Sequence, residues 1–124
     1  NGKEVFVMSE LYGRMQAFLG DERQLMERMA GRLDLWEECV LLFPKYEIID
    51  EIEAAVQAQE EQMLYASVHR LKGNLANFGF DSPAESAIQV LEAIKADRVA
   101  EIKKRYGELV TTYKEIIERI GEAE

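Results

Sequence analysis

Residues 69–79 read HRLKGNLANFG and contain the only histidine of the 124-residue chain, His69. A single imidazole excludes histidine clusters and paired-histidine metal sites, and leaves the roles of core residue, isolated acid or base, or nucleophile. Lys72 lies three residues further on, one helical turn away on the same side. Gly73 follows it, although glycine inside a helix costs about 1 kcal/mol relative to alanine. We interpret this cost as a sign that something approaches the helix closely beside His69.

Apolar residues around this motif recur at the spacing of a core-facing helix. They are Leu64, Val68, Leu71, Leu75 and Phe78. With about 100° of rotation per residue, His69 projects about 140° away from the centre of this stripe, which excludes a core position. An idle surface histidine would leave the small residues beside it unexplained. We therefore predict an open docking surface for an anion-bearing partner, formed on the outer face by Gln62, Tyr65, Ala66, Lys72, Gly73 and Ala76.

The motif resembles the signature of histidine-containing phosphotransfer (HPt) domains. The matching positions are His69, Leu71, Lys72, Gly73, Phe78 and Gly79. In outline the resemblance extends from Leu33 to Ile120, with departures at Val68 and Asn74, where smaller residues are common. It implies a helical bundle that carries a phosphoryl group on Nε2 of His69 between the aspartates of receiver domains. It also implies a glutamine near the histidine, for which Gln89 is the candidate, and we include Arg70 in the docking surface.

Composition is consistent with one such domain. A formal net charge of −9 argues against nucleic acid as a partner, because phosphate binding needs clustered basic residues. The one dense basic run, Lys103-Lys104-Arg105, is interleaved with glutamates and is predicted to be a solvated helix face. No apolar run approaches the roughly 20 residues of a membrane span, and no signal-peptide pattern is present. The single Cys39 is predicted to fill the core, and we expect a cytoplasmic protein.

The pattern along the chain predicts an all-α fold, an antiparallel four-helix bundle with additional N-terminal helices. We expect residues 1–32 to form a helical extension, either packed on the bundle or a linker, and residues 33–124 to form the bundle itself. The extension contains a helix over residues 8–19 stopped by Gly20, and a short segment from Asp21 to Ala30 closed by Gly31. The apolar side chains of these helices are interpreted as core and not as a cofactor site.

Within the bundle, capping signals mark the helix starts. Asp34-Leu35-Trp36-Glu37 opens a long helix that Pro44 should kink or split. Its predicted apolar side contains Leu35, Cys39, Leu42, Tyr46, Ile49 and Val56. A break near residues 57–61 precedes the His69 helix, which Gly79 ends, and Ser82-Pro83-Ala84-Glu85 caps the next helix. Asp97 is predicted to cap the last helix, whose apolar stripe is Val99, Ile102, Tyr106, Leu109, Tyr113, Ile116 and Ile120.

The chemistry expected of His69 is nucleophilic. Its unprotonated nitrogen attacks an aspartyl phosphate, and Lys72 stabilises the charge of the transferred group. No P-loop or kinase-type glycine-rich loop is present, so we expect a phosphoryl carrier and not an autonomous kinase. The expected partners are response-regulator receiver domains, which supply Mg²⁺, and a sensor or hybrid histidine kinase. Two alternatives stay open: the phosphotransfer domain of a chemotaxis-type kinase, and a helical interaction module that is never phosphorylated.

Overall fold

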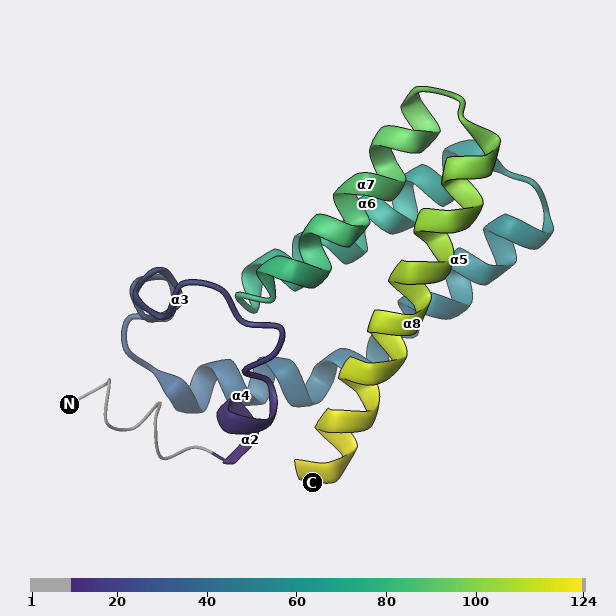
Figure 1. Ribbon diagram of the computed structural model, residues 1–124. Helices are drawn as coiled ribbons and strands as arrows, with labels where there is room; N and C mark the ends of the chain where they lie inside the picture. The colour runs from purple at the N-terminus through teal and green to yellow at the C-terminus, as the bar shows by residue number, and fades with distance from the viewer. Residues whose placement is uncertain (1–9, 124) are drawn as a thin grey trace.

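The computed structural model describes residues 10–123, with side chains from residue 10 to residue 121. All regular structure in this range is helical, which confirms the predicted all-α class (Figure 1). The elements in chain order are α2 (Glu10–Arg14), α3 (Glu22–Arg28), α4 (Leu33–Leu42), the 3₁₀ turn η1 (Phe43–Tyr46), α5 (Ile48–Gln57), α6 (Glu61–Asn77), α7 (Asp81–Lys95) and α8 (Val99–Ala123).

Helices α5, α6, α7 and α8 form the predicted antiparallel bundle. Each packs against the next in sequence, and short connections at 58–60, 78–80 and 96–98 reverse the chain between them. In Figure 1, α6 and α7 lie side by side as a hairpin, and both α5 and α8 lie to its right; α5 packs against α6, and α8 packs against α7. The residues that these helices bury almost completely are Ile48, Ile52, Ala55, Val68, Leu71, Leu75, Ala87, Val90, Leu109, Ile116 and Ile120.

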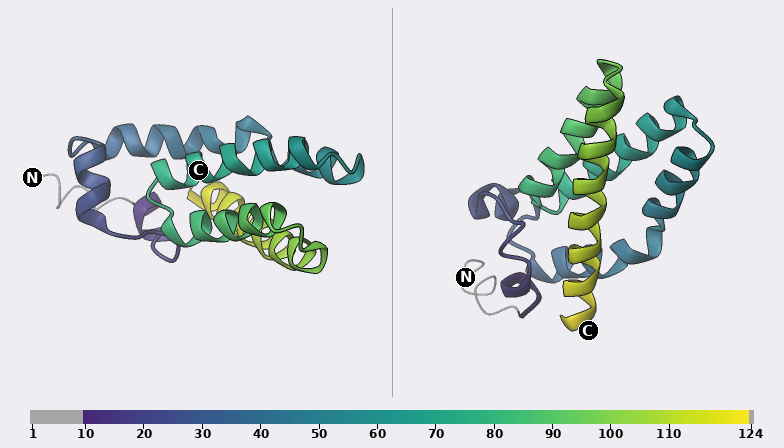
Figure 2. Two further views of the ribbon diagram at one scale, coloured as in Figure 1. Left: turned by 90° about the horizontal axis from the view of Figure 1, so that it is seen from above. Right: turned by 45° about the vertical axis from the view of Figure 1, so that its right-hand side comes forward.

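Helix α8 joins the two ends of the molecule. Its 25 residues rise about 37 Å along the axis, so it continues past the α6–α7 hairpin toward α2 (Figures 1 and 2). There α2 packs against it, and Nη1 of Arg119 donates a hydrogen bond of 3.3 Å to the carbonyl of Arg14. The predicted stripe of α8 is buried at Leu109 and beyond. Val99 at its first position is exposed instead, because it directly follows the 96–98 connection at the end of the bundle.

The first predicted helix, over residues 8–19, is much shorter in the structure. Met8 lies outside the described residues, and α2 ends at Arg14. The backbone then continues as turns, in which the amide of Phe18 donates to the carbonyl of Met15 at 3.0 Å. Both of these side chains are buried. The predicted extent of the helix was therefore wrong, but its apolar side chains lie in the core as expected. Turns after Arg14 also bring these side chains onto the core, because tertiary burial outweighs local helix preference.

Helix α3 begins and ends close to the predicted residues. The carboxylate of Asp21 accepts a hydrogen bond of 2.9 Å from the amide of Arg23 and so caps the N-terminus. The helix ends at Arg28, and Gly31 then takes a left-handed φ of +73°. A side chain is disfavoured at this φ, which explains glycine as the closing residue.

Pro44 splits the predicted long helix, which was one of the two expected outcomes. It lies in η1, and Glu47 then adopts a left-handed φ of +53° before α5 begins. This break resets the helical phase, so the single apolar side predicted across it is wrong. The exposed residues of that side are Leu35, Leu42, Tyr46 and Val56, while Cys39 and Ile49 are half-buried. The residues buried in their place are Leu33, Trp36, Val40, Phe43, Ile48 and Ile52.

Three predicted helix starts are displaced by one or two residues. Helix α4 begins at Leu33, so Asp34 lies inside its first turn and makes no capping box. Helix α7 begins at Asp81, ahead of the predicted cap at residues 82–85, because the fully buried Phe80 fixes the start of the turn. Asp97 takes a left-handed φ of +55° in the connection before α8, one residue too early to cap it.

Candidate functional site

Helix α6 carries the motif of residues 69–79, and its core stripe is oriented as the sequence predicted. The apolar residues of the stripe are all buried: Leu64, Val68, Leu71, Leu75 and, directly after the helix, Phe78. His69 projects away from them and is exposed to solvent. The imidazole is therefore presented to solvent from the middle of a 17-residue helix that is packed on both flanks.

The outer face beside His69 is open. Gln62 and Ala66 are exposed, and Ala76 is half-buried. A Cβ atom placed on Gly73 would meet no neighbouring atom within 4 Å, and the φ of Gly73 is not positive. Neither packing against the described residues nor the backbone conformation requires glycine there. The prediction that Gly73 serves the approach of a partner is therefore consistent with its surroundings.

Lys72 is half-buried on the same side of α6 as His69, one turn further along. This spacing brings an ammonium group into the neighbourhood of any anion bound to the imidazole. The pair thus combines an exposed imidazole with a positively charged side chain one helical turn away.

Tyr65 lies one turn before His69, and its ring stacks with the imidazole. The two ring centroids are 6.3 Å apart and the planes differ by 22°. From α7, Lys95 places its Nζ atom 5.7 Å from the centroid of the Tyr65 ring. Sequence reasoning missed Lys95. Because α6 and α7 are antiparallel, residues at equal distances before and after the 78–80 connection lie side by side. This count places the end of α7 beside the first turns of α6, and it could have identified Lys95.

Arg70 connects α6 to α5. Its guanidinium forms an ion pair with Glu51, and both side chains are about half exposed. An exposed pair of this kind contributes about 1 kcal/mol or less to stability. A hollow of about 400 Å³ adjoins the pair, lined by Tyr46, Ile48, Glu51, Arg70 and Asn74. Arg70 therefore belongs to the flank of the His69 face, and a docking role for it remains a prediction.

Gln89 lies on a different side of α7 from Lys95. It is half-buried and lines a groove of about 440 Å³ whose residues come from α7, α8 and the connection between them. No residue of α6 lines this groove. A place for Gln89 in the docking surface around His69 therefore remains a prediction.

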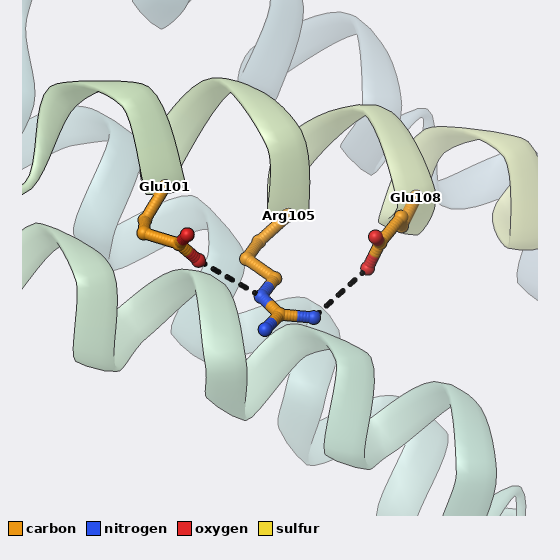
Figure 3. A network of polar contacts seen from close by, with 3 residues as sticks. All are labelled: Glu101, Arg105 and Glu108. Atoms are coloured by element: carbon orange, nitrogen blue, oxygen red, sulfur yellow. Dashed lines mark hydrogen bonds and ion pairs between the residues drawn. The ribbon is translucent and has the colours of Figure 1, made fainter.

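The same groove contains Arg105 from the basic run of α8. Figure 3 shows its guanidinium between two carboxylates of the same helix, with 3.3 Å to Glu101 and 3.4 Å to Glu108. The other two members of the run, Lys103 and Lys104, are exposed. The run is thus a solvated and partly neutralised helix face.

The last two residues of the motif, Phe78 and Gly79, form the turn between α6 and α7 and bind it to the N-terminal part of the chain. Gly79 has a left-handed φ of +78°, and its carbonyl accepts a hydrogen bond of 3.0 Å from the amide of Gly20. A Cβ atom on Gly79 would come within 3.2 Å of Leu25. The carbonyl of Phe78 accepts a hydrogen bond of 2.9 Å from Nε1 of Trp36. Phe78 and Gly79 thus have structural roles, whereas Gly73 faces open space.

Comparison with known protein families assigns this arrangement. The model of the Hpt domain matches residues 46–123, well over half of the chain. This chain belongs to the Hpt domain family. Hpt domains are histidine phosphotransfer modules of phosphorelays, and the predicted resemblance is thereby confirmed. The match covers α5 to α8, including His69, and begins after α4. Searches of the curated proteins and of the solved structures gave no match.

The described part of this Hpt domain contains no group of three or more His, Cys, Asp or Glu side chains arranged to hold a metal ion. None of its helices in residues 10–123 is long and apolar enough to cross a bilayer.

Proposed function

We propose that His69 is the phosphoacceptor of this Hpt domain, and that it takes the phosphoryl group from a receiver-domain aspartyl phosphate and passes it to a second receiver. The observation that carries this proposal is the exposed imidazole in the middle of α6, on the side opposite the buried stripe. His69 is also the only histidine of the chain. No other side chain can therefore form a phosphohistidine.

The transfer is a direct displacement at phosphorus. The lone pair of the unprotonated imidazole nitrogen, which the family resemblance implies is Nε2, forms the N–P bond while the bond to the aspartate oxygen breaks. The aspartate leaves as a carboxylate, and the reverse reaction delivers the group to the next receiver. The phosphoryl group carries close to two negative charges, which Lys72 is positioned to stabilise.

The docking face is proposed to be the outer side of α6. Ala66, Gly73 and Ala76 leave it free of large side chains, so the active-site edge of a receiver can reach His69. The receiver would supply Mg²⁺, which would help to neutralise the charge of the phosphoryl group. A sensor or hybrid histidine kinase stands upstream in this scheme, and the chain itself acts as a carrier in the cytoplasm.

We further propose that residues 33–124 form the phosphotransfer unit and residues 1–32 an N-terminal extension, whose described part, residues 10–32, packs on it. Helix α4 lies ahead of the family match but shares the core through Trp36, and the 3₁₀ turn η1 that directly follows it does so through Phe43; both side chains are fully buried. The rings of Phe43 and Tyr113 of α8 have centroids 5.5 Å apart. This packing supports counting α4 with the bundle.

The test is to incubate the chain with a receiver domain carrying ³²P on its aspartate. We expect label that is labile in acid and stable in base, the behaviour of phosphohistidine. His69→Gln should take no label and keep the melting temperature of the parent, because the side chain is exposed. The matched control, Lys104→Gln, introduces the same side chain on the exposed face of α8 and should be labelled. Label on His69→Gln would overturn the proposal, and labelling only by an ATP-bound kinase would favour the chemotaxis-type alternative.

A further inference from the structure

His69, Tyr65 and Lys95 form a stack that extends from α6 to α7. The Tyr65 and His69 rings are nearly parallel, at 22°, with centroids 6.3 Å apart. Nζ of Lys95 lies 5.7 Å from the Tyr65 centroid, within the distance of a cation–π contact. Lys95 is exposed, and none of the carboxylates in the described part of the chain forms an ion pair with it. Its described interaction is therefore with the aromatic face.

The stack stands beside open space. A hollow of about 570 Å³ adjoins it, lined by Glu61, Gln62, Tyr65, Ile94 and Lys95. Tyr65 is half-buried, and its side chain packs at the edge of the hydrophobic core. An exposed histidine on a helix would otherwise sample several side-chain rotamers. A parallel ring one turn away restricts that rotation, and a cation over the ring restricts the tyrosine in turn.

We propose that Tyr65 and Lys95 are positioning residues for His69. Tyr65 holds the imidazole plane in the orientation that presents a ring nitrogen to the incoming phosphorus, and Lys95 holds Tyr65 from the neighbouring helix. This inference rests on the proposed role of His69 as phosphoacceptor. It assigns to the last turn of α7 a part in transfer that the motif of residues 69–79 does not contain.

A simpler explanation for Lys95 is the favourable interaction of a cation with the C-terminal end of α7. That explanation predicts an effect on stability and none on the imidazole. The two explanations therefore differ in a spectroscopic signature. Because the chain has one histidine, the NMR signals of the His69 ring protons can be assigned without ambiguity. Their chemical shifts are sensitive to the ring current of a stacked aromatic side chain such as Tyr65.

The experiment compares Lys95→Met, Lys95→Arg, Tyr65→Leu and Tyr65→Phe with the control Lys103→Met on the exposed face of α8. We expect the His69 ring signals to move in Lys95→Met and Tyr65→Leu, and to stay near the parent values in Lys95→Arg, Tyr65→Phe and the control. Transfer from a phosphorylated receiver should slow about threefold in Lys95→Met, the rate equivalent of one exposed cation–π contact, and recover in Lys95→Arg.

Unchanged His69 signals in both Lys95→Met and Tyr65→Leu would overturn the inference, as would a parent transfer rate in Lys95→Met. A lower melting temperature with unchanged signals would assign Lys95 to the helix end alone. If the parent chain takes no label from a receiver, the proposed function fails. The NMR comparison needs no receiver, so it still decides whether Lys95 orients the imidazole.

Discussion

Nε1 of Trp36 donates a hydrogen bond of 2.9 Å to the backbone carbonyl of Phe78, and this bond joins α4 to the connection at the end of α6. The indole is fully buried and contacts the rings of Tyr12 and Phe80, with centroids 5.5 Å and 6.5 Å away. Trp36 precedes the family match, which begins at residue 46. The end of the phosphotransfer motif is therefore held by an element outside the part of the chain that the family model describes.

Replacing Trp36 with Phe should test this hydrogen bond. The variant keeps an apolar ring but leaves the buried carbonyl of Phe78 without its donor, and an unsatisfied buried group costs about 1–3 kcal/mol. We expect the free energy of unfolding, measured in urea, to fall by at least about 1 kcal/mol. Leu35→Ala, at the exposed neighbouring position, should change it by about 0.5 kcal/mol or less. Equal stability of Trp36→Phe and the parent would show that this hydrogen bond makes no net contribution to stability.

Lys72→Ala should fold like the parent but transfer phosphoryl groups more slowly. A loss of 1.4 kcal/mol of transition-state stabilisation slows the reaction about tenfold, and we expect at least this effect. Single-turnover transfer from a labelled receiver measures it. Lys103→Ala removes an equal charge from the exposed face of α8 and should leave the rate unchanged. Equal transfer rates for the two variants would show that Lys72 does not stabilise the transition state more than any other surface charge does.

Asp34 should titrate well below an ordinary aspartate. A hydrogen bond from Arg32 lowers the pKa of its carboxyl from 3.8 to about 2, and the two side chains also form an ion pair at 2.7 Å. A lowered pKa stabilises the fold above pH 3.8, and that contribution is lost as the pH falls toward 2. NMR titration should show this pKa at low salt and its return toward 3.8 in Arg32→Ala. An unchanged titration in that variant would contradict the assignment.

The sequence predicted the buried and exposed sides of α6 well, because the apolar spacing keeps a constant phase along a single unbroken helix. Leu64 and Leu75 fall on the buried side and His69 on the exposed side, as a constant rotation per residue requires. The same reasoning failed across Pro44, because two helices with separate phases cannot share one stripe. Trp36 was assigned to a capping signature, yet it is completely buried.

Contacts between helices were the part of the site that periodicity could not supply. Tyr65 was placed on the outer face of α6 by its angle, but periodicity does not link it to Lys95, thirty residues later. Only a count along both helices of the α6–α7 hairpin brings the two residues to the same level. Gln89 was assigned to the site by resemblance, and its true position depends on how α7 is rotated against α6. That rotation is set by the packing of side chains from both helices, which a single-sequence pattern does not encode.

The two glycines of the motif should respond oppositely to substitution. Gly79→Ala places a Cβ at a φ of +78° and within 3.2 Å of Leu25, so we expect it to destabilise the fold by about 1 kcal/mol or more. Gly73→Ala meets no atom within 4 Å and should stabilise α6 by up to about 1 kcal/mol. Urea denaturation of both variants checks the difference. A loss of stability in Gly73→Ala would place that residue in a packed contact.

Gly73→Gln separates the fold from the docking surface. The long side chain enters open space, so the variant should be at least as stable as the parent in urea denaturation. It also stands one turn from His69 on the face that a receiver must reach, so most transfer from a phosphorylated receiver should be lost. Gly107→Gln is the matched control, because it adds the same side chain to an equally open position on α8. Normal transfer by Gly73→Gln would show that this glycine does not serve the close approach of a partner.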